Sequence, residues 1–96
     1  MRYKRIIFSG HAIRQIFGRG FKKDDVIITI QGGQVIADYP DDRPYPSCLK
    51  LGFVDNIPLH VVFAVDEEQQ VGIVITAYIP DAKLWSGDFK SRRTEL

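Results

Sequence analysis

The sequence predicts a single α+β domain in which two N-terminal helices pack on one face of a four- to five-stranded, mainly antiparallel sheet. Three observations support this prediction. Helical spacing of apolar residues is confined to residues 9–33, alternating apolar patterns fill residues 34–79, and the turns between those patterns are short. Because strands joined by short turns pair antiparallel, the strand-rich part should form one sheet that the two helices cover.

Length and composition restrict the chain to one globular unit. Its 96 residues suffice for one modest core, and its hydrophobic fraction of 45% is that of an ordinary soluble protein. No apolar run approaches the roughly 18 residues of a membrane-spanning helix, and no signal peptide is recognisable. The one cysteine, Cys48, permits no internal disulfide and should be a small buried hydrophobe. We expect a cytoplasmic protein with one domain over residues 1–96, an ordered core over about residues 3–85 and a loose basic tail over residues 86–96.

The first predicted elements are a short strand and a helix. Residues 3–8 should be extended, and Ser9 is a favourable N-cap for a helix over residues 10–18, which ends at glycines. His11 and Arg14 fall on the polar side of this helix. Because residues three apart on a helix are neighbours, these two side chains can act together.

Residues 21–33 fit either a helix or a strand. Asp24 and Asp25 suit the first turn of a helix, and Gly32 suits its C-terminal cap. The run over residues 26–30 has instead the β-branched composition of a strand. We predict a helix, because a strand would need the two glycines that follow it as an immediate hairpin turn.

Four strands are predicted to follow. A proline-rich loop at residues 40–46, a short turn before Pro58 and a polar turn near Glu68 separate them. Their predicted ranges are 34–39, 47–54, 59–65 and 73–79. After the last strand, Asp81 should cap a short helix that runs through Trp85.

The long hairpin of residues 58–80 has two faces of different character. Pairing about Glu68 would bring His60 close to Ala77 and Tyr78. The residues expected beneath the helices are the more apolar set of the last strand: Ile73, Ile75, Ala77 and Ile79. The residues expected on the open face are polar: His60, Thr76, Tyr78 and Lys50.

Some of these polar groups are of the kind that metal-independent RNA cleavage needs. The sequence has no glycine-rich phosphate loop, no zinc motif and no Ser-His-Asp hydrolase signature. A ribonuclease without a metal needs a base for the 2′-hydroxyl, an acid for the leaving 5′-oxygen and a cation for the phosphorane. The candidate catalytic residues are His11, Arg14, His60, Thr76 and Tyr78. Each also has an ordinary structural explanation, and the alternative that they form no site stays open.

Charge is unevenly distributed along the chain, although the formal net charge is only +1. Residues 1–23 contain seven basic residues and no acidic one, whereas residues 24–81 contain ten acidic residues and two basic ones. Such segregation favours a basic surface that binds a polyanion. Alternatively, the basic ends balance the acidic loops. The candidate substrate-binding residues are Arg5, Lys50, Arg92 and Arg93.

Several segments together resemble one small bacterial family. They are Ser9-Gly-His-Ala-Ile-Arg14, the run Gly-Gly-Gln-Val-Ile-Ala-Asp-Tyr-Pro40, Leu59-His-Val-Val and Val74-Ile-Thr-Ala-Tyr-Ile-Pro80, followed by Trp85 and a basic end. The family is the domain of unknown function 4258, and the resemblance extends from about residue 6 to residue 93.

The resemblance implies a RelE-like fold, because this family is similar in architecture to the RelE/ParE and barnase-like toxin ribonucleases. It also implies RNA as the substrate, a zinc-finger/helix-turn-helix antitoxin as the protein partner, and no cofactor or metal. By resemblance, the five candidate catalytic residues occupy the family's motif positions. Our expectation is a toxin-like endoribonuclease, and the alternative is a non-catalytic module that binds protein or nucleic acid.

Overall fold

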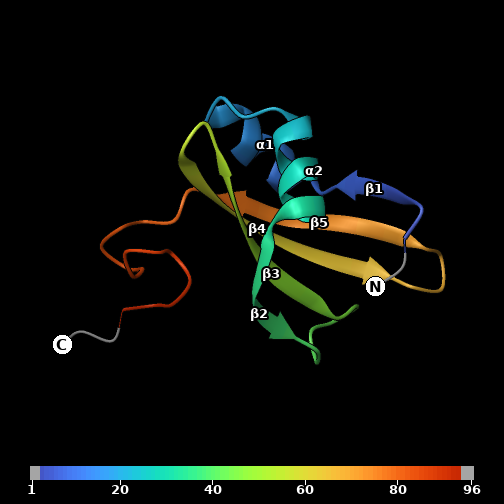
Figure 1. Ribbon diagram of the computed structural model, residues 1–96. Helices are drawn as coiled ribbons and strands as arrows, with labels where there is room; N and C mark the ends of the chain where they lie inside the picture. The colour runs from blue at the N-terminus through green and yellow to red at the C-terminus, as the bar shows by residue number, and fades with distance from the viewer. Residues whose placement is uncertain (1–2, 94–96) are drawn as a thin grey trace.

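The computed structural model, which describes residues 3–93, contains two helices and one five-stranded sheet (Figure 1). The elements in chain order are β1 (Arg5–Phe8), α1 (Gly10–Gly18), α2 (Lys23–Gly32), β2 (Gln34–Tyr39), β3 (Ser47–Val54), β4 (Ile57–Asp66) and β5 (Val71–Tyr78). The strand order is β1-β5-β4-β3-β2, and every pairing is antiparallel except that of β1 with β5. The predicted α+β class, with a mainly antiparallel sheet, is confirmed.

At the start of each helix, a side chain accepts a hydrogen bond from a backbone amide. Ser9 has an extended backbone, and its hydroxyl accepts a hydrogen bond of 3.0 Å from the amide of Ala12. At the start of α2, the carboxylate of Asp25 accepts a hydrogen bond of 2.9 Å from the amide of Lys22. The helix predicted between residues 21 and 33 is therefore confirmed. Its β-branched composition is tolerated because Val26 and Ile30 are buried at helical spacing.

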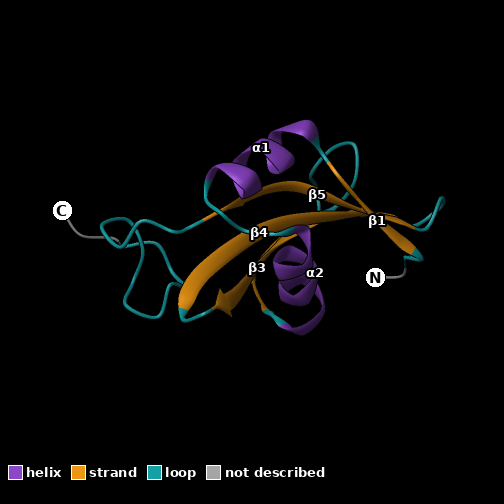
Figure 2. Ribbon diagram, turned by 90° about the horizontal axis from the view of Figure 1, so that it is seen from above, coloured by secondary structure: helices purple, strands orange, loops and turns teal. Residues whose placement is uncertain are grey.

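Both helices lie on the same face of the sheet (Figure 2), with α1 over β5 and α2 over β3 and β4. The fully buried residues of this layer include Ile16 from α1, Ile30 from α2, and Leu59, Val61 and Phe63 from β4. Because side chains alternate along a strand, His60 points to the opposite face, which we call the open face. None of the helices in the described part of the chain is long and apolar enough to cross a membrane.

An irregularity in the β4–β5 pairing changes which residues of β5 face the helices. The pairing register shifts between Val62 and Phe63. As a result, Val74 and Ala77 join the core beneath the helices, whereas Ile75 is 38% exposed. The prediction for Ala77 was right, but the prediction that Ile73 and Ile75 lie beneath the helices was wrong, since strict alternation does not survive a bulge.

The C-terminal strap, which we define as residues 79–93, is an ordered part of the molecule. Trp85 is buried and pairs with Arg92 through an isolated β-bridge. The predicted loose tail is therefore wrong for residues 86–93, and residues 94–96 lie outside the described part. The short helix predicted after Asp81 is only a turn, in which the amides of Leu84 and Trp85 both donate to the carbonyl of Asp81.

Candidate functional site

The N-terminal part of α1 completes the edge of β5. The strand β1 pairs with β5 only as far as Phe8 and Val74. Beyond this point, the hydroxyl of Ser9 donates to the carbonyl of Ile75 at 2.9 Å. The Oε1 atom of Gln15 accepts a hydrogen bond of 3.2 Å from the amide of Ala77 and another from the hydroxyl of Thr76. Side chains of α1 therefore bond the edge of β5 where no strand does.

Thr76 lies at the edge of β5, where the open face of the sheet meets α1. It pairs with Val62 as Tyr78 pairs with His60, without a register shift between the two pairs, so it lies on the open face as predicted. Its hydroxyl donates to Gln15 of α1 at the strand edge. The bulge lies on the other side of Val62, between the pairs Val62–Thr76 and Phe63–Val74, so it leaves the alternation of Thr76 and Tyr78 intact.

His11 and Arg14 are both exposed on α1, as the helical spacing predicts. The guanidinium of Arg14 extends back toward the start of the helix, where its Nη1 atom lies 3.5 Å from the position of a Cβ added at Gly10. The first turn contains no acidic residue. A cation at the positive end of a helix is unfavourable by about 0.3–1 kcal/mol unless an anion lies nearby. This end of α1 is therefore chemically suited to an anionic group.

His60 lies on the open face with none of its surface exposed. Its Nε2 atom is 2.8 Å from the carbonyl oxygen of Phe89, and its Nδ1 atom is 3.2 Å from the hydroxyl of Tyr78. The ring of Trp85 packs edge to face against it, with the two centroids 4.4 Å apart. The C-terminal strap thus covers this histidine.

The two hydrogen bonds determine the tautomer of His60. A carbonyl oxygen can only accept, so Nε2 carries the proton that is donated to Phe89, and Nδ1 accepts from the hydroxyl of Tyr78. Burial lowers the pKa of His60, and the hydrogen bond to Phe89 offsets part of this effect. Burial likewise raises the pKa of Tyr78. In the folded protein, His60 is a neutral side chain that links the strap to the sheet.

The five candidate catalytic residues therefore form two groups. His11, Arg14 and Thr76 lie on α1 and at the adjacent edge of β5, whereas His60 and Tyr78 lie together on the open face under the strap. The sheet separates His11 and Arg14 from His60, since α1 packs on the face opposite His60. A single phosphate group could not contact both histidines.

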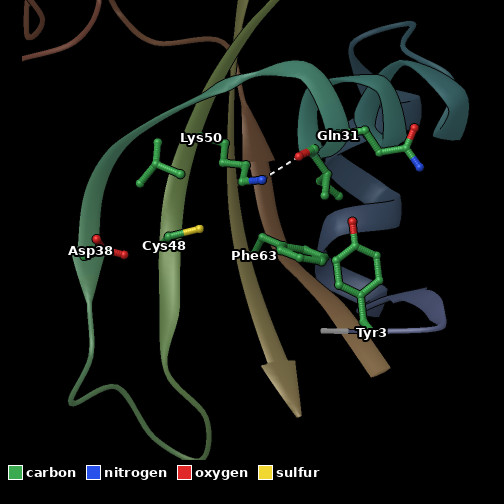
Figure 3. A pocket seen from close by; sticks show the side chains of 8 residues that line it. Tyr3, Gln31, Asp38, Cys48, Lys50 and Phe63 are labelled. Atoms are coloured by element: carbon green, nitrogen blue, oxygen red, sulfur yellow. Dashed lines mark hydrogen bonds between the residues drawn. The ribbon is translucent and has the colours of Figure 1, made fainter. Parts of the chain in front are cut away.

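Lys50 lies on the helical side, and the prediction that it shares the open face with His60 was wrong. Its ammonium group donates to the carbonyl of Ile30 at the end of α2. It lines a hollow of about 560 Å³ between α2 and the sheet. Figure 3 shows Cys48 and Phe63 below it and Asp38 on the neighbouring strand. Burial raises the pKa of the Cys48 thiol, which fits the expected buried hydrophobe rather than a nucleophile.

The remaining candidate substrate-binding residues lie apart from one another. Arg5 is exposed on β1 at the sheet edge. Arg92 lies over the ring of Trp85, with its guanidinium carbon 5.5 Å from the ring centroid. The Nε atom of Arg93 donates to the carbonyl of Ala82 at 3.0 Å. Together with Lys50, these residues do not form one basic surface.

Two groups that take part in these hydrogen bonds were not predicted from the sequence. Gln15 stood on the polar side of the first helix, one turn after His11, and this spacing was the only available signal. The carbonyl of Phe89 gave no signal, because a backbone group carries no residue-specific information. Within residues 3–93, no group of three or more histidine, cysteine or acidic side chains could hold a metal ion.

Comparison with known proteins identifies a family but no individual protein that matches the chain. The model of the family described as "Domain of unknown function (DUF4258)" matches residues 8–79. Searches of curated proteins and of solved structures found no match. The matched residues comprise α1, α2, all of β2 to β5 and most of the polar groups described above. The chain belongs to the DUF4258 family.

Proposed function

We propose that this protein is a toxin-like, metal-independent endoribonuclease whose substrate phosphate binds at the start of α1. The observation that carries the proposal is the exposure of His11 and Arg14 together near the start of α1, whose first turn contains no acidic residue. Imidazole is the side chain best suited to proton transfer near neutral pH, and guanidinium binds phosphate oxygens in pairs. The similarity in architecture between this family and the RelE/ParE and barnase-like toxin ribonucleases supports the same reaction class.

In the proposed reaction, His11 accepts the proton of a ribose 2′-hydroxyl, and the 2′-oxygen forms a bond to phosphorus. The bond between phosphorus and the 5′-oxygen breaks, and a water molecule supplies the proton that this oxygen takes. The products are a 2′,3′-cyclic phosphate and a 5′-hydroxyl. Arg14 balances the negative charge that develops on the phosphorane oxygens. His60 takes no part, because both of its ring nitrogens are bonded within the protein.

The test is cleavage of a single-stranded RNA in EDTA by wild type, His11→Ala, Arg14→Ala and Arg19→Ala. We expect a loss of about 10²–10⁴-fold for His11→Ala and of about 10²-fold or more for Arg14→Ala. Arg19 is the matched control, since it is an exposed arginine at the other end of the same helix, and its replacement should leave the rate unchanged. Equal rates for all four proteins would reject the proposed roles, and an inactive wild type would reject the enzyme.

We also propose that a zinc-finger/helix-turn-helix antitoxin binds the protein. The resemblance is the main support, and the exposed apolar side chains Phe53 and Ile57 beside the β3–β4 turn suit a protein contact. Expression of the wild type alone should arrest bacterial growth. Co-expression of an adjacently encoded protein of that class should restore growth and give a complex that co-purifies.

A non-catalytic nucleic-acid-binding module is the second candidate. One observation favours it: of the two histidines, only His11 is exposed, so the protein lacks the second imidazole that an acid–base pair would use. This function predicts RNA binding that depends on Arg14 and no appearance of cyclic phosphate ends. The cleavage assay above, with product analysis, separates the two candidates.

A further inference from the structure

The orientation of the Gln15 side chain follows from its contacts. Its amide oxygen faces the backbone N–H of Ala77 at 3.2 Å and also accepts from the hydroxyl of Thr76. A backbone N–H can only donate, so the atom that faces Ala77 must be oxygen and not nitrogen. The NH₂ group of Gln15 therefore points away from β5.

This NH₂ group is accessible to solvent. It has no partner among the hydrogen bonds of residues 3–93, and no side-chain nitrogen or oxygen buried in that range lacks a partner. Gln15 lies one helical turn after His11, so both side chains occupy the same side of α1. Arg14 is the adjacent residue, and its guanidinium extends toward the same end of the helix.

The choice of glutamine is informative. A glutamate could accept the hydrogen bonds from Ala77 and Thr76 at least as strongly, since bonds to a charged acceptor are stronger. What only the amide provides is a pair of N–H donors without negative charge. Anchoring of α1 to β5 thus accounts for one half of the Gln15 side chain, and the other half is a donor on the side of α1 that carries His11.

We infer that Gln15 is a substrate-contact residue, whose NH₂ group donates to a non-bridging phosphate oxygen of RNA held by His11 and Arg14. This inference rests on the proposed function. Two hydrogen bonds fix the amide before the substrate arrives, so the donor needs no rearrangement to meet the charge that develops in the reaction. Gln15 in this role also explains why the anchor of α1 lies on the same side of the helix as His11.

The test compares Gln15→Glu with Gln15→Ala. Gln15→Glu keeps an oxygen for Ala77 and Thr76, so its thermal unfolding temperature should stay close to that of the wild type. Its cleavage rate should fall about 100-fold, the usual loss for one transition-state donor. Its affinity for a 2′-O-methyl oligoribonucleotide, which cannot be cleaved, should fall as well. Gln15→Ala loses the anchor in addition, so its unfolding temperature should drop.

The outcomes separate this inference from the proposed function. A Gln15→Glu protein that binds and cleaves like the wild type overturns the inference alone and reduces Gln15 to an anchor. The same holds if both variants lose activity only in proportion to lost stability. A wild type that binds the 2′-O-methyl oligonucleotide without cleaving RNA rejects the ribonuclease, while the binding comparison still decides the role of Gln15. A wild type that does not bind the oligonucleotide overturns both.

Discussion

At the scale of single residues, His60 connects two parts of the chain that are distant in sequence. One ring nitrogen bonds Tyr78 of the sheet, and the other bonds Phe89 of the strap. Phe89 has a φ of 61°, a left-handed conformation that costs a residue with a side chain roughly 1–2 kcal/mol. The hydrogen bond from His60 and the burial of Trp85 offset that cost. His60 therefore helps to hold the strap in position.

The burial of His60 makes stability depend on pH. Its pKa in the folded protein lies below the ordinary value of 6.5, so under mildly acidic conditions the unfolded chain binds a proton that the folded chain does not. Stability should be fully present above about pH 7 and should decrease as pH falls through about 6.5. Urea unfolding at about pH 7.5 and about pH 5.5 measures the difference.

His60→Gln should remove this dependence, and it should also lower stability at neutral pH because a buried hydrogen-bonding pair is disturbed. His11→Gln is the matched control, since His11 is exposed and its replacement should leave the dependence unchanged. The assignment to His60 fails if the wild type and His60→Gln show the same change between the two pH values.

The sequence predicted the closeness of His60 and Tyr78 but not their surroundings. Their distance follows from the length of the turn between β4 and β5, which is a local property, and the two residues are indeed paired. The burial of His60 depends on the strap, in which the backbone carbonyl of Phe89, 29 residues away, accepts its hydrogen bond. The polar composition of this segment suggested a loose tail. Such tertiary contacts leave no periodic pattern in a sequence.

At the scale of elements, the junction between α2 and β2 fixes how the helix sits against the sheet. Gly33 stands at this junction, and a Cβ there would lie 2.7 Å from the carbonyl oxygen of Leu51 and even closer to that of Thr29. Both obstacles are backbone atoms, which cannot move aside as a flexible side chain can. The preceding residue, Gly32, has nothing within 4 Å of the same position.

These two adjacent glycines give a sharp prediction. Gly33→Ala should destabilise the protein by about 1–3 kcal/mol or more, because α2 and β3 must separate to admit the methyl group. Gly32→Ala should be neutral or stabilising by up to about 1 kcal/mol, since alanine has the better helix propensity. Chemical denaturation of both variants tests this. Similar losses in the two would show that the junction is not tightly packed.

The elements also show which features of the fold periodicity can predict and which it cannot. Both helices were predicted because caps and glycines are local signals, and four strands were predicted because their alternation is local too. The bulge beside Val62 involves only the pairing of two strands, so no pattern within either strand reveals it. It is the reason that Val74 joins Ala77 beneath the helices in place of Ile73 and Ile75.

At the scale of the whole molecule, different segments cover the two faces of the sheet. The helices cover one face with a continuous apolar core, whereas the strap covers the region of His60 on the other. The strap has little secondary structure of its own, and its main apolar contribution is Trp85. Segments with few buried apolar contacts open at lower free energy than the core. The strap should therefore detach without unfolding of the sheet.

Trp85→Ala tests whether the strap opens separately from the core, because truncation of a buried tryptophan removes most of the apolar area that holds the strap. Hydrogen exchange should accelerate at amides of residues 84–93 and stay slow in the core at Val61 and Val74. RNA cleavage should persist under the proposed function, since His11 and Arg14 lie on the helical side, away from Trp85. If core amides exchange faster as well, the strap is part of the cooperative core. If cleavage disappears while the core stays protected, the reaction takes place on the open face at His60, and the site at the start of α1 is wrong.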